Sequence, residues 1–297
     1  MPRSRVTTAL IPAAGRGTRF LPVTKVVPKE LLPIVSTPAL EYVVAEAVRN
    51  GLTDVILVVN QGKQAIADYF APHPELEAAL AAKRDDAALA AIRRPEQLAT
   101  IHEVEQFEPR GLGDAVAYGE DLAAGRAVAV LLPDDLIDES DDLLEQMLRV
   151  YDEHGGVVVG LMDVPRAEIR RYGCVATSRV DGDVVTIEDL VEKPAPEQAP
   201  STLAIIGRYV LPPEIFASIR DAPPGAGGEI QLTDAMLRLV RDGMPAHGVV
   251  FRGQRYDTGE PLGYVRAVVQ LATRHPELGA PFTAWLRDYV SGLEREE

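Results

Sequence analysis

Residues 6–22, VTTALIPAAGRGTRFLP, carry an apolar run directly into a loop of small residues and cations. The run at 6–11 is continuous, and it predicts a buried β-strand. In the loop, Gly15 and Gly17 lack side chains, so backbone N–H groups can approach a phosphate closely. A bare Gly-x-Gly is more often a simple turn, and this spacing matches neither the Walker pattern nor the dinucleotide fingerprint. The stretch therefore predicts a strand that opens onto an anion-binding loop.

Cations gather around this loop in a chain that is otherwise acidic. The 297 residues carry a formal net charge of −15. The segment that ends at Glu30 nevertheless holds four spaced cations near the loop, Arg16, Arg19, Lys25 and Lys29. Such a cluster favours a small polyanionic ligand. The overall charge argues against a nucleic-acid-binding surface, because such surfaces need clustered Lys and Arg.

Further along the chain, apolar runs alternate with helix-like stretches. Buried strands are predicted at 6–11, 55–59, 127–132 and 157–161. Helices are predicted at 39–50, 76–94, 113–123 and 142–153. This alternation predicts an α/β fold, with a Rossmann-like, mixed but mostly parallel sheet flanked by helices on both faces. Ligands of such sheets bind beyond the carboxyl ends of the strands.

The second half of the chain has a different pattern. Strands predicted at 174–180 and 184–191 flank Asp181-Gly182, which is a strong hairpin signal. A further strand is predicted at 203–211, and a proline-rich surface loop at 194–200. Helices are predicted at 230–241, 262–274 and 282–293.

Composition indicates an ordinary soluble globular protein, with 46% hydrophobic and 25% charged residues. No apolar run reaches about 18 residues, so no membrane helix is expected. The first apolar run leads into the glycine loop, and we interpret it as a strand rather than a signal peptide. Cys174 is the only cysteine, so no internal disulfide can form, and a reducing cytoplasm is the expected compartment.

Three further polar segments are candidates for chemistry. Asp134 and Asp135 follow the strand at 127–132, where a carboxylate suits Mg²⁺, although an Asp there can equally cap a helix. The pair Glu192-Lys193 could bind sugar hydroxyls and a phosphate, although such pairs are usually solvated surface pairs. Asp257, in a polar turn, either caps the following helix or supplies a second carboxylate to the metal.

Together these segments resemble one family, the nucleotidyltransferases that make nucleotide-sugars, and within it the bacterial UTP–glucose-1-phosphate uridylyltransferases. The motifs that carry the resemblance are GRGTRFLP at 15–22, PKELLP at 28–33, GLG at 111–113, LPDD at 132–135, YG at 172–173, VEKP at 191–194, GRY at 207–209 and EIQLTD at 229–234. The resemblance implies a nucleotide-diphospho-sugar transferase fold as one domain over 1–297. It divides this domain into a nucleotide-binding half at 1–160, a sugar-phosphate-binding half at 161–260 and C-terminal helices at 261–297.

The resemblance also implies a role for each matching position. Nucleotide contacts are implied at Ala13, Ala14, Gly15, Gly17, Lys25, Glu30, Gln106 and Gly111. Catalytic roles are implied for Arg19 and Lys29 on the triphosphate and for Lys193 on the attacking phosphate. Sugar-phosphate contacts are implied at Asp135, Gly173, Glu192 and Lys193, and Mg²⁺ ligands at Asp134 and Asp257. A side-chain amide carries one donor and one acceptor group, which fits Gln106 to an edge of uracil.

The implied reaction joins UTP to glucose 1-phosphate, in a homodimer or homotetramer. The sugar phosphate attacks the α-phosphorus without a base, because a phosphate monoester has a second pKa of about 6. Catalysis then consists of positioning and charge neutralisation. The alternatives are a dTTP-using relative, a catalytically silent paralogue and, against the glycine spacing, a dinucleotide-dependent dehydrogenase.

Three positions depart from the family pattern. Arg16 stands where an aliphatic residue is usual, and it adds a cation near the phosphates. Ser36-Thr37 replaces an Asp-Lys type of pair before Pro38. Asp114 stands where we expect His. An anion at that position leaves base and sugar preference open, although Asp114 could equally be a simple helix-start residue.

Overall fold

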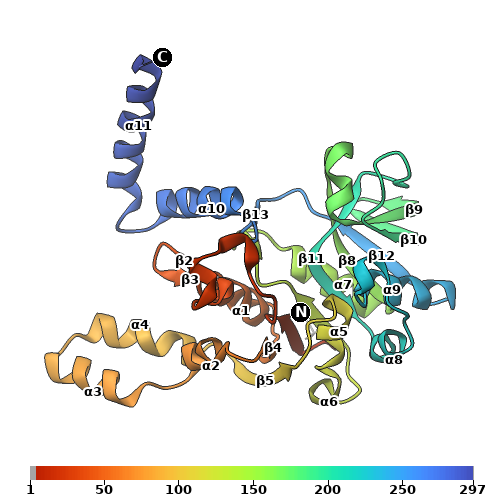
Figure 1. Cartoon of the computed structure of the whole chain (residues 1–297), viewed down its shortest axis with the longest axis horizontal. Coiled ribbons are helices and arrows are strands. Elements are labelled where there is room, and N and C mark those ends of the chain that lie inside the picture. Colours follow the sequence, from red (N-terminus) through yellow and green to blue (C-terminus); the bar gives the residue numbers. More distant parts are fainter. Residues whose placement is uncertain (1–4, 297) are drawn as a thin grey trace.

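The computed structural model describes the chain from Arg5 to Glu296, so the ends of the predicted domain at 1–4 and 297 lie outside the described residues. Within that range the centre is a nine-stranded sheet, ordered β5-β4-β1-β6-β11-β8-β12-β10-β9 (Figure 1). The strands are β1 Thr8–Pro12, β4 Asp54–Asn60, β5 Thr100–Gln106, β6 Val128–Leu131, β8 Val157–Asp163, β9 Gly173–Asp181, β10 Val184–Glu192, β11 Leu203–Leu211 and β12 Ala246–Val250. In this sheet only β10 and β11 run against the other strands. The prediction of a mixed, mostly parallel sheet is confirmed.

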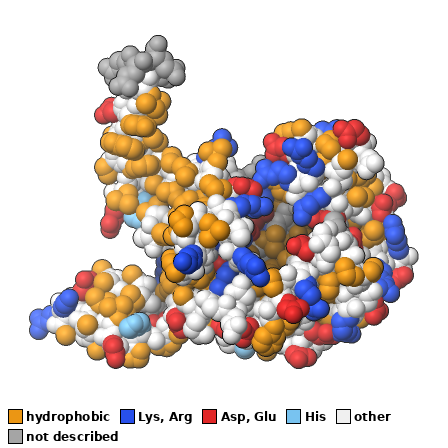
Figure 2. All heavy atoms as spheres, in the orientation of Figure 1, with side chains coloured by type: hydrophobic (Ala, Val, Ile, Leu, Met, Phe, Trp, Pro, Cys, Tyr) orange, Lys and Arg blue, Asp and Glu red, His pale blue; other side chains and the backbone are white. Residues whose placement is uncertain are grey.

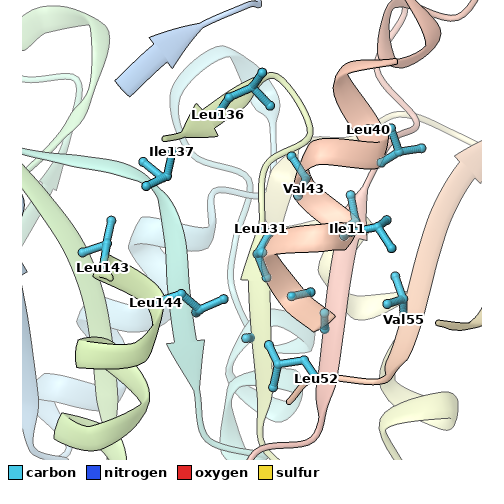
Figure 3. Packing of buried hydrophobic residues seen from close by; sticks show 14 of the residues in the cluster. Ile11, Leu40, Val43, Leu52, Val55, Leu131, Leu136, Ile137, Leu143 and Leu144 are labelled. Carbon is cyan, nitrogen blue, oxygen red and sulfur yellow. The ribbon is translucent and has the colours of Figure 1, made fainter. Parts of the chain in front are cut away.

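Helices cover both faces of the sheet, because neighbouring residues of β1 point to opposite sides. Ile11 belongs to one hydrophobic cluster and Leu10 to the other. The Ile11 face is covered by α1 Ala39–Arg49, α7 Leu143–His154 and α10 Pro261–Arg274. The Leu10 face is covered by α5 Leu112–Ala117, α8 Glu214–Arg220 and α9 Leu232–Arg241. Figure 3 shows the first cluster, where Ile11 and Leu131 from the strands lie near Val43 from α1.

The predicted hairpin in the second half is present, but its turn is displaced by one residue. Asp181 pairs with Val184, so the two turn residues are Gly182 and Asp183 rather than Asp181 and Gly182. Gly182 has a φ of 62°, which a glycine adopts without the steric cost of a Cβ.

Two predicted helices are interrupted. Residues 76–94 form two helices, α3 Pro74–Lys83 and α4 Asp86–Glu96. The break falls at Arg84, which is left-handed with a φ of 55°, and Asp85 then accepts a bond from the Ala88 N–H to cap α4. The stretch at 113–123 likewise forms α5 and a separate α6 Glu120–Ala123.

Several elements were not predicted. They are β5, β12, α2 Gln64–Phe70, α8 and two short two-stranded sheets, β2 Pro33–Ile34 with β3 Thr37–Pro38 and β7 Asp135–Ile137 with β13 Arg255–Asp257. The last helix, α11 Gly279–Glu296, is longer than predicted and extends away from the body of the molecule (Figure 1). Among the described residues, no helix is long and apolar enough to cross a membrane.

Candidate active site

The glycine loop leaves the carboxyl end of β1, as predicted. The Ala13 N–H donates to the Val58 carbonyl at 2.7 Å, which holds the start of the loop against β4. Gly17 has a φ of 62°, in the left-handed region that favours glycine. A Cβ on Gly15 would lie 3.7 Å from Lys29 Cε, so the Lys29 side chain lies directly beside the loop. The structure thus brings the glycine loop and a cation together.

Beneath the loop lies a buried ion pair that the sequence analysis missed. Lys63 Nζ donates to the two oxygens of Glu30 at 2.9 and 2.8 Å, and to the Ala13 carbonyl at 2.6 Å. Burial is the largest influence on both groups, and it raises the pKa of Glu30 and lowers the pKa of Lys63. Glu30 is only 1% exposed, so a direct nucleotide contact by Glu30 does not fit the structure. Both of its oxygens face Lys63, through which it supports the loop.

We expect Lys63→Met to destabilise the protein by about 3–5 kcal/mol, because it leaves the Glu30 carboxylate buried without its partner. The free energy of unfolding from urea titration measures this. Lys83→Met, an exposed lysine at the end of α3, is the matched control and should change it by less than about 0.5 kcal/mol. The double variant Lys63→Met with Glu30→Gln should lose less than Lys63→Met alone. Equal losses would show that the two charges do not act as a pair.

Asp134 and Asp257 converge on Gly259. Asp134 Oδ2 lies 2.8 Å, and Asp257 Oδ1 3.3 Å, from the point where a Cβ on Gly259 would stand. Thr258 fixes this arrangement, because its N–H and hydroxyl donate to the main-chain carbonyl of Asp134 at 2.8 and 2.9 Å. The pairing of β7 with β13 brings the two segments together. The absence of a side chain at Gly259 keeps the space beside both carboxylates open.

This arrangement fits a divalent cation that takes some of its ligands from the protein and others from a substrate. The described residues contain no group of three or more His, Cys, Asp or Glu placed to hold a metal. A cation beside Asp134 and Asp257 would therefore take its other ligands from water and phosphate. Mg²⁺ prefers this combination of one or two carboxylates, several waters and substrate phosphates.

Lys29 and Asp134 contact each other directly, with 2.5 Å between Nζ and Oδ2. Burial acts to raise the pKa of Asp134, but Lys29 outweighs it and holds the pKa below its ordinary value. Burial acts to lower the pKa of Lys29, but Asp134 and Glu30 outweigh it and the pKa is raised. Both groups are therefore charged at neutral pH.

Two arginines at the same place also contact acidic side chains. Arg19 donates to the Gly259 carbonyl at 3.4 Å, and its Nε lies 3.3 Å from Glu260 Oε1. Arg171, which the sequence analysis did not single out, lies 3.6 Å from Asp257 Oδ2 and 3.5 Å from Glu260 Oε1. These cations and carboxylates neutralise one another. A ligand that carries both phosphates and a divalent cation can replace the whole set of contacts at once.

A cavity of about 270 Å³ adjoins these carboxylates, and the predicted sugar-phosphate residues line it. Its lining includes Asp134, Asp257, Gly173, Glu192 and Lys193. Thr233 Oγ1 donates to Glu192 Oε2 at 2.8 Å, and a Cβ on Gly173 would lie 3.3 Å from the same oxygen. Lys193 has a φ of 45° and its Nζ lies 3.1 Å from Glu192 Oε1, so its ammonium group stands at this cavity. The structure brings Gly173, Glu192 and Lys193 together.

Asp135 also lines this cavity, and neighbouring groups hold its side chain. It is 5% exposed, and it binds Arg255 through two bonds, from Nε at 2.5 Å and from Nη2 at 2.9 Å. Its Oδ2 also accepts the Gly207 N–H at 3.0 Å. A sugar-phosphate contact by Asp135 would therefore share this carboxylate with Arg255 and Gly207. Asp135 thus joins β7, β11 and β13 at the wall of the cavity.

Gln106 and Gly111 lie at the carboxyl edge of the sheet, on the side of the glycine loop. Gln106 pairs in register with Asn60, and Asn60 Nδ2 donates to the Ala14 carbonyl at 2.5 Å. Gly111 has a φ of 112°, and a Cβ there would stand 2.7 Å from the Ile230 carbonyl, so only glycine fits. Lys25 and Arg16, in contrast, are exposed, and no contact among the described residues ties either to this site.

Comparisons with known proteins agree with this geometry. The family model described as nucleotidyl transferase matches residues 8–274. The chain is 42% identical over 294 residues to the UTP–glucose-1-phosphate uridylyltransferase YngB of Bacillus subtilis, covering 99% of both chains. It is 42% identical over 274 residues to the UTP–glucose-1-phosphate uridylyltransferase of Staphylococcus haemolyticus, covering 92% of this chain and 95% of that protein.

Solved structures are similar over almost the full length. The UTP-bound UGPase from Acinetobacter baumannii superposes with a TM-score of 0.88 at 36% identity, covering 95% of this chain and 98% of that one. A UDP-glucose pyrophosphorylase complexed with UDP-glucose gives a TM-score of 0.82 at 36% identity, covering 91% of this chain and all of that one. The family model and the full-length relatives show that this chain belongs to the nucleotidyl transferase family.

Proposed function

We propose that this protein joins UTP to glucose 1-phosphate, forming UDP-glucose and releasing pyrophosphate. The observation that carries the proposal is the contact of Lys29 with Asp134, beside Gly15 and at the edge of the cavity that Lys193 lines. The glycine loop on one side of this contact suits a triphosphate, and the cavity with Lys193 on the other side suits a sugar phosphate. The names of the relatives, which are uridylyltransferases acting on glucose 1-phosphate, support the choice of both substrates.

In this proposal the protein's residues position two polyanions and neutralise their charge. The attacking oxygen belongs to the sugar phosphate, which is largely dianionic at neutral pH and needs no base. Lys193 holds that phosphate. Thr233 orients Glu192, which accepts hydrogen bonds from sugar hydroxyls. Arg19 and Lys29 leave their carboxylate partners for the triphosphate and stabilise the departing pyrophosphate.

Mg²⁺ is the cofactor that we propose, with Asp134 and Asp257 as its protein ligands. Oxygens of both carboxylates lie within 3.3 Å of the position that a Cβ on Gly259 would take. When bound, the ion would offset phosphate charge and help to align the two substrates. Lys29 is the group that must move away from Asp134 for the ion to bind.

The test is a matrix of UTP, dTTP, CTP and ATP against glucose 1-phosphate and other sugar 1-phosphates, read by pyrophosphate release with Mg²⁺ present. Highest kcat/KM for UTP with glucose 1-phosphate supports the proposal. Preference for dTTP would identify a thymidylyltransferase instead. No release from any pair would favour a silent paralogue. In a separate assay with a nicotinamide cofactor, a change in its absorbance would favour a dehydrogenase.

Lys193→Ala should lower kcat/KM for glucose 1-phosphate at least tenfold. Losing a charge-assisted hydrogen bond costs about 1.5–3 kcal/mol, and each ~1.4 kcal/mol is a factor of ten. The affinity for UTP alone, measured by calorimetry, should barely change, because Lys193 lies on the sugar side. An unchanged kcat/KM would make Lys193 a solvated surface residue.

The proposal treats residues 1–297 as one cytoplasmic catalytic domain. The nucleotide binds to the half at 1–160 and the sugar phosphate to the half at 161–260. The helices at 261–297 carry a separate role, the association of two copies of the chain.

Half of the exposed large hydrophobic side chains of the described residues lie on or between α10 and α11. They are Leu262, Val265, Leu278, Trp285, Tyr289, Val290 and Leu293. On α11 they recur at helical spacing, with Trp285 and Tyr289 stacked at a centroid distance of 5.3 Å. Figure 2 shows hydrophobic side chains covering this projecting arm. A surface of this kind marks an interaction site.

A second copy of this chain is the occupant that we propose for the arm. The arm of one copy can pack on the same arm of another, as in the two-fold interfaces common in homodimers. Next to the apolar stripe, Arg287 and Asp288 carry opposite charges. In an antiparallel pair each could face its opposite on the partner helix.

Trp285→Asp with Tyr289→Asp should convert the dimer to a monomer in sedimentation equilibrium. Each change places a charge in the apolar seam without touching the active site. Val180→Asp, at an exposed valine on the β9–β10 hairpin, is the matched control and should remain dimeric. A monomeric unmodified protein, or a dimer that survives both substitutions, would refute this interface.

A further inference from the structure

The side chain of Gln106 is held by an acidic neighbour at the end of β5. Gln106 Nε2 donates to Asp114 Oδ2 at 2.6 Å. The other oxygen of Asp114 accepts a bond from Arg110 Nη2 at 2.9 Å. Gln106 and Asp114 are 2% and 4% exposed, so solvent does not compete strongly for these bonds. Asp114 lies in the first turn of α5, and both of its oxygens are bonded to side chains outside the helix backbone.

This contact determines which way round the Gln106 amide lies. A carboxylate only accepts hydrogen bonds, whereas an amide has a donating NH₂ group and an accepting oxygen. The NH₂ group must therefore face Asp114, and Oε1 must point away from it. Among the described residues Oε1 accepts no bond, yet it is not one of the fully buried polar atoms left without a partner. The oxygen is thus an oriented acceptor that a ligand can reach.

The place of Gln106 connects this acceptor with a nucleotide base. Gln106 lies beside Asn60, which holds the Ala14 carbonyl of the glycine loop, and the loop ends near the phosphate-binding Lys29. Uracil presents an N3–H donor on its pairing edge, and thymine presents the same donor. Cytosine presents a bare N3 acceptor there. A fixed Oε1 attracts the first two bases and repels the third.

We infer that Asp114 is a specificity-determining residue, which locks the Gln106 amide in the orientation that accepts uracil N3–H and rejects cytosine. The inference rests on the proposed function for the assignment of Gln106 to the base. It differs from a general role in binding, because it concerns the choice between bases and not the affinity for triphosphate.

The test is the ratio of UTP to CTP affinity, measured by calorimetry, in Asp114→Asn. Asn has one acceptor for two donors, so its NH₂ group can turn to Gln106 and allow the amide to reverse. The UTP to CTP affinity ratio should fall at least tenfold, while the UTP to dTTP ratio stays unchanged. Asp121→Asn, the same change at an exposed position on α6, is the matched control and should leave both ratios unaltered.

A second variant keeps the inference testable if Asp114→Asn folds poorly. Asp114→Asn with Gln106→Glu exchanges the two groups, so that Glu accepts from Asn and still offers an oxygen to N3–H. This variant should restore the preference for UTP over CTP to within a few-fold of the original. An unchanged ratio in folded Asp114→Asn, or no recovery in the exchanged variant, would overturn the inference. Absence of pyrophosphate release from the unmodified protein would instead refute the proposed function, because the binding ratios do not depend on turnover.

Discussion

Asp134→Asn is expected to lower kcat by about a hundredfold to a thousandfold, the usual loss when one electrostatic stabiliser is removed from a site. The substitution changes only one side-chain oxygen. The bonds from Thr258 end on the main-chain carbonyl of residue 134, so they persist in the variant. The fold should therefore persist. Loss of the Lys29–Asp134 ion pair should lower the melting temperature, so turnover is measured by pyrophosphate release well below it.

Asp257→Asn should cause a loss of similar size, although Asp257 contacts Arg171 and not Lys29. Excess Mg²⁺ should partly restore either single variant, because the remaining carboxylate still supplies one ligand. The double variant should be little worse than either single one, since ligands of one ion act as a unit. Asp163→Asn, an exposed carboxylate at the end of β8, is the matched control.

The outcome for Asp257 decides whether the two carboxylates share an ion. Full activity of Asp257→Asn would leave Asp134 as the sole protein ligand. Multiplying losses in the double variant would indicate two independent roles. Gly259→Ala offers an independent check, because its Cβ would stand 2.8 Å from Asp134 Oδ2. That methyl group should weaken metal binding and lower turnover while both carboxylates remain.

Pattern and position predicted the central strands and the place of the glycine loop well. Buried runs such as the one at 6–11 mark central strands, and the loop after β1 lies at the carboxyl edge because strand ends gather there. The break in the helix predicted at 76–94 was also readable, because Asp85 and Asp86 form a typical helix start. Strands of two or three residues, such as β7 and β13, are too short to carry a detectable period.

Those short strands are the reason why part of the site could not be derived from sequence. The pairing of β7 with β13 brings Asp134 near Asp257, and nothing in their separation along the chain indicates it. Sequence also cannot tell which carboxylates are fully bonded within the protein and which stay open to a ligand. Glu30 and Asp135 stand in the same motifs as Lys29 and Asp134, yet both are buried and each bonds a cation through both of its oxygens. Lys63, at the carboxyl end of β4, could have been suspected from its position alone.

Lys29→Met is expected to lower kcat/KM for UTP by about a hundredfold or more, because it removes the cation that lies beside both the glycine loop and the carboxylates. Lys29 is largely buried, with a side chain 19% exposed, so its charge is screened less than that of a surface lysine. Lys25→Met, in the same segment but exposed, should cost only a few-fold. Equal losses from the two variants would show that the segment attracts phosphate by its total charge and not through Lys29.

A second measurement distinguishes the effect of Lys29 on Asp134 from its effect on the triphosphate. In this structure the Lys29 ammonium group contacts the Asp134 carboxylate, which would be a ligand of the metal in the proposed function. Removing it frees that carboxylate, so Mn²⁺ binding without nucleotide, followed by electron paramagnetic resonance, should become tighter in Lys29→Met even as turnover falls. Weaker Mn²⁺ binding would mean that Lys29 holds Asp134 in place for the metal. Tighter binding with slower turnover would show that Lys29 and the metal compete for Asp134 until the triphosphate draws the lysine away.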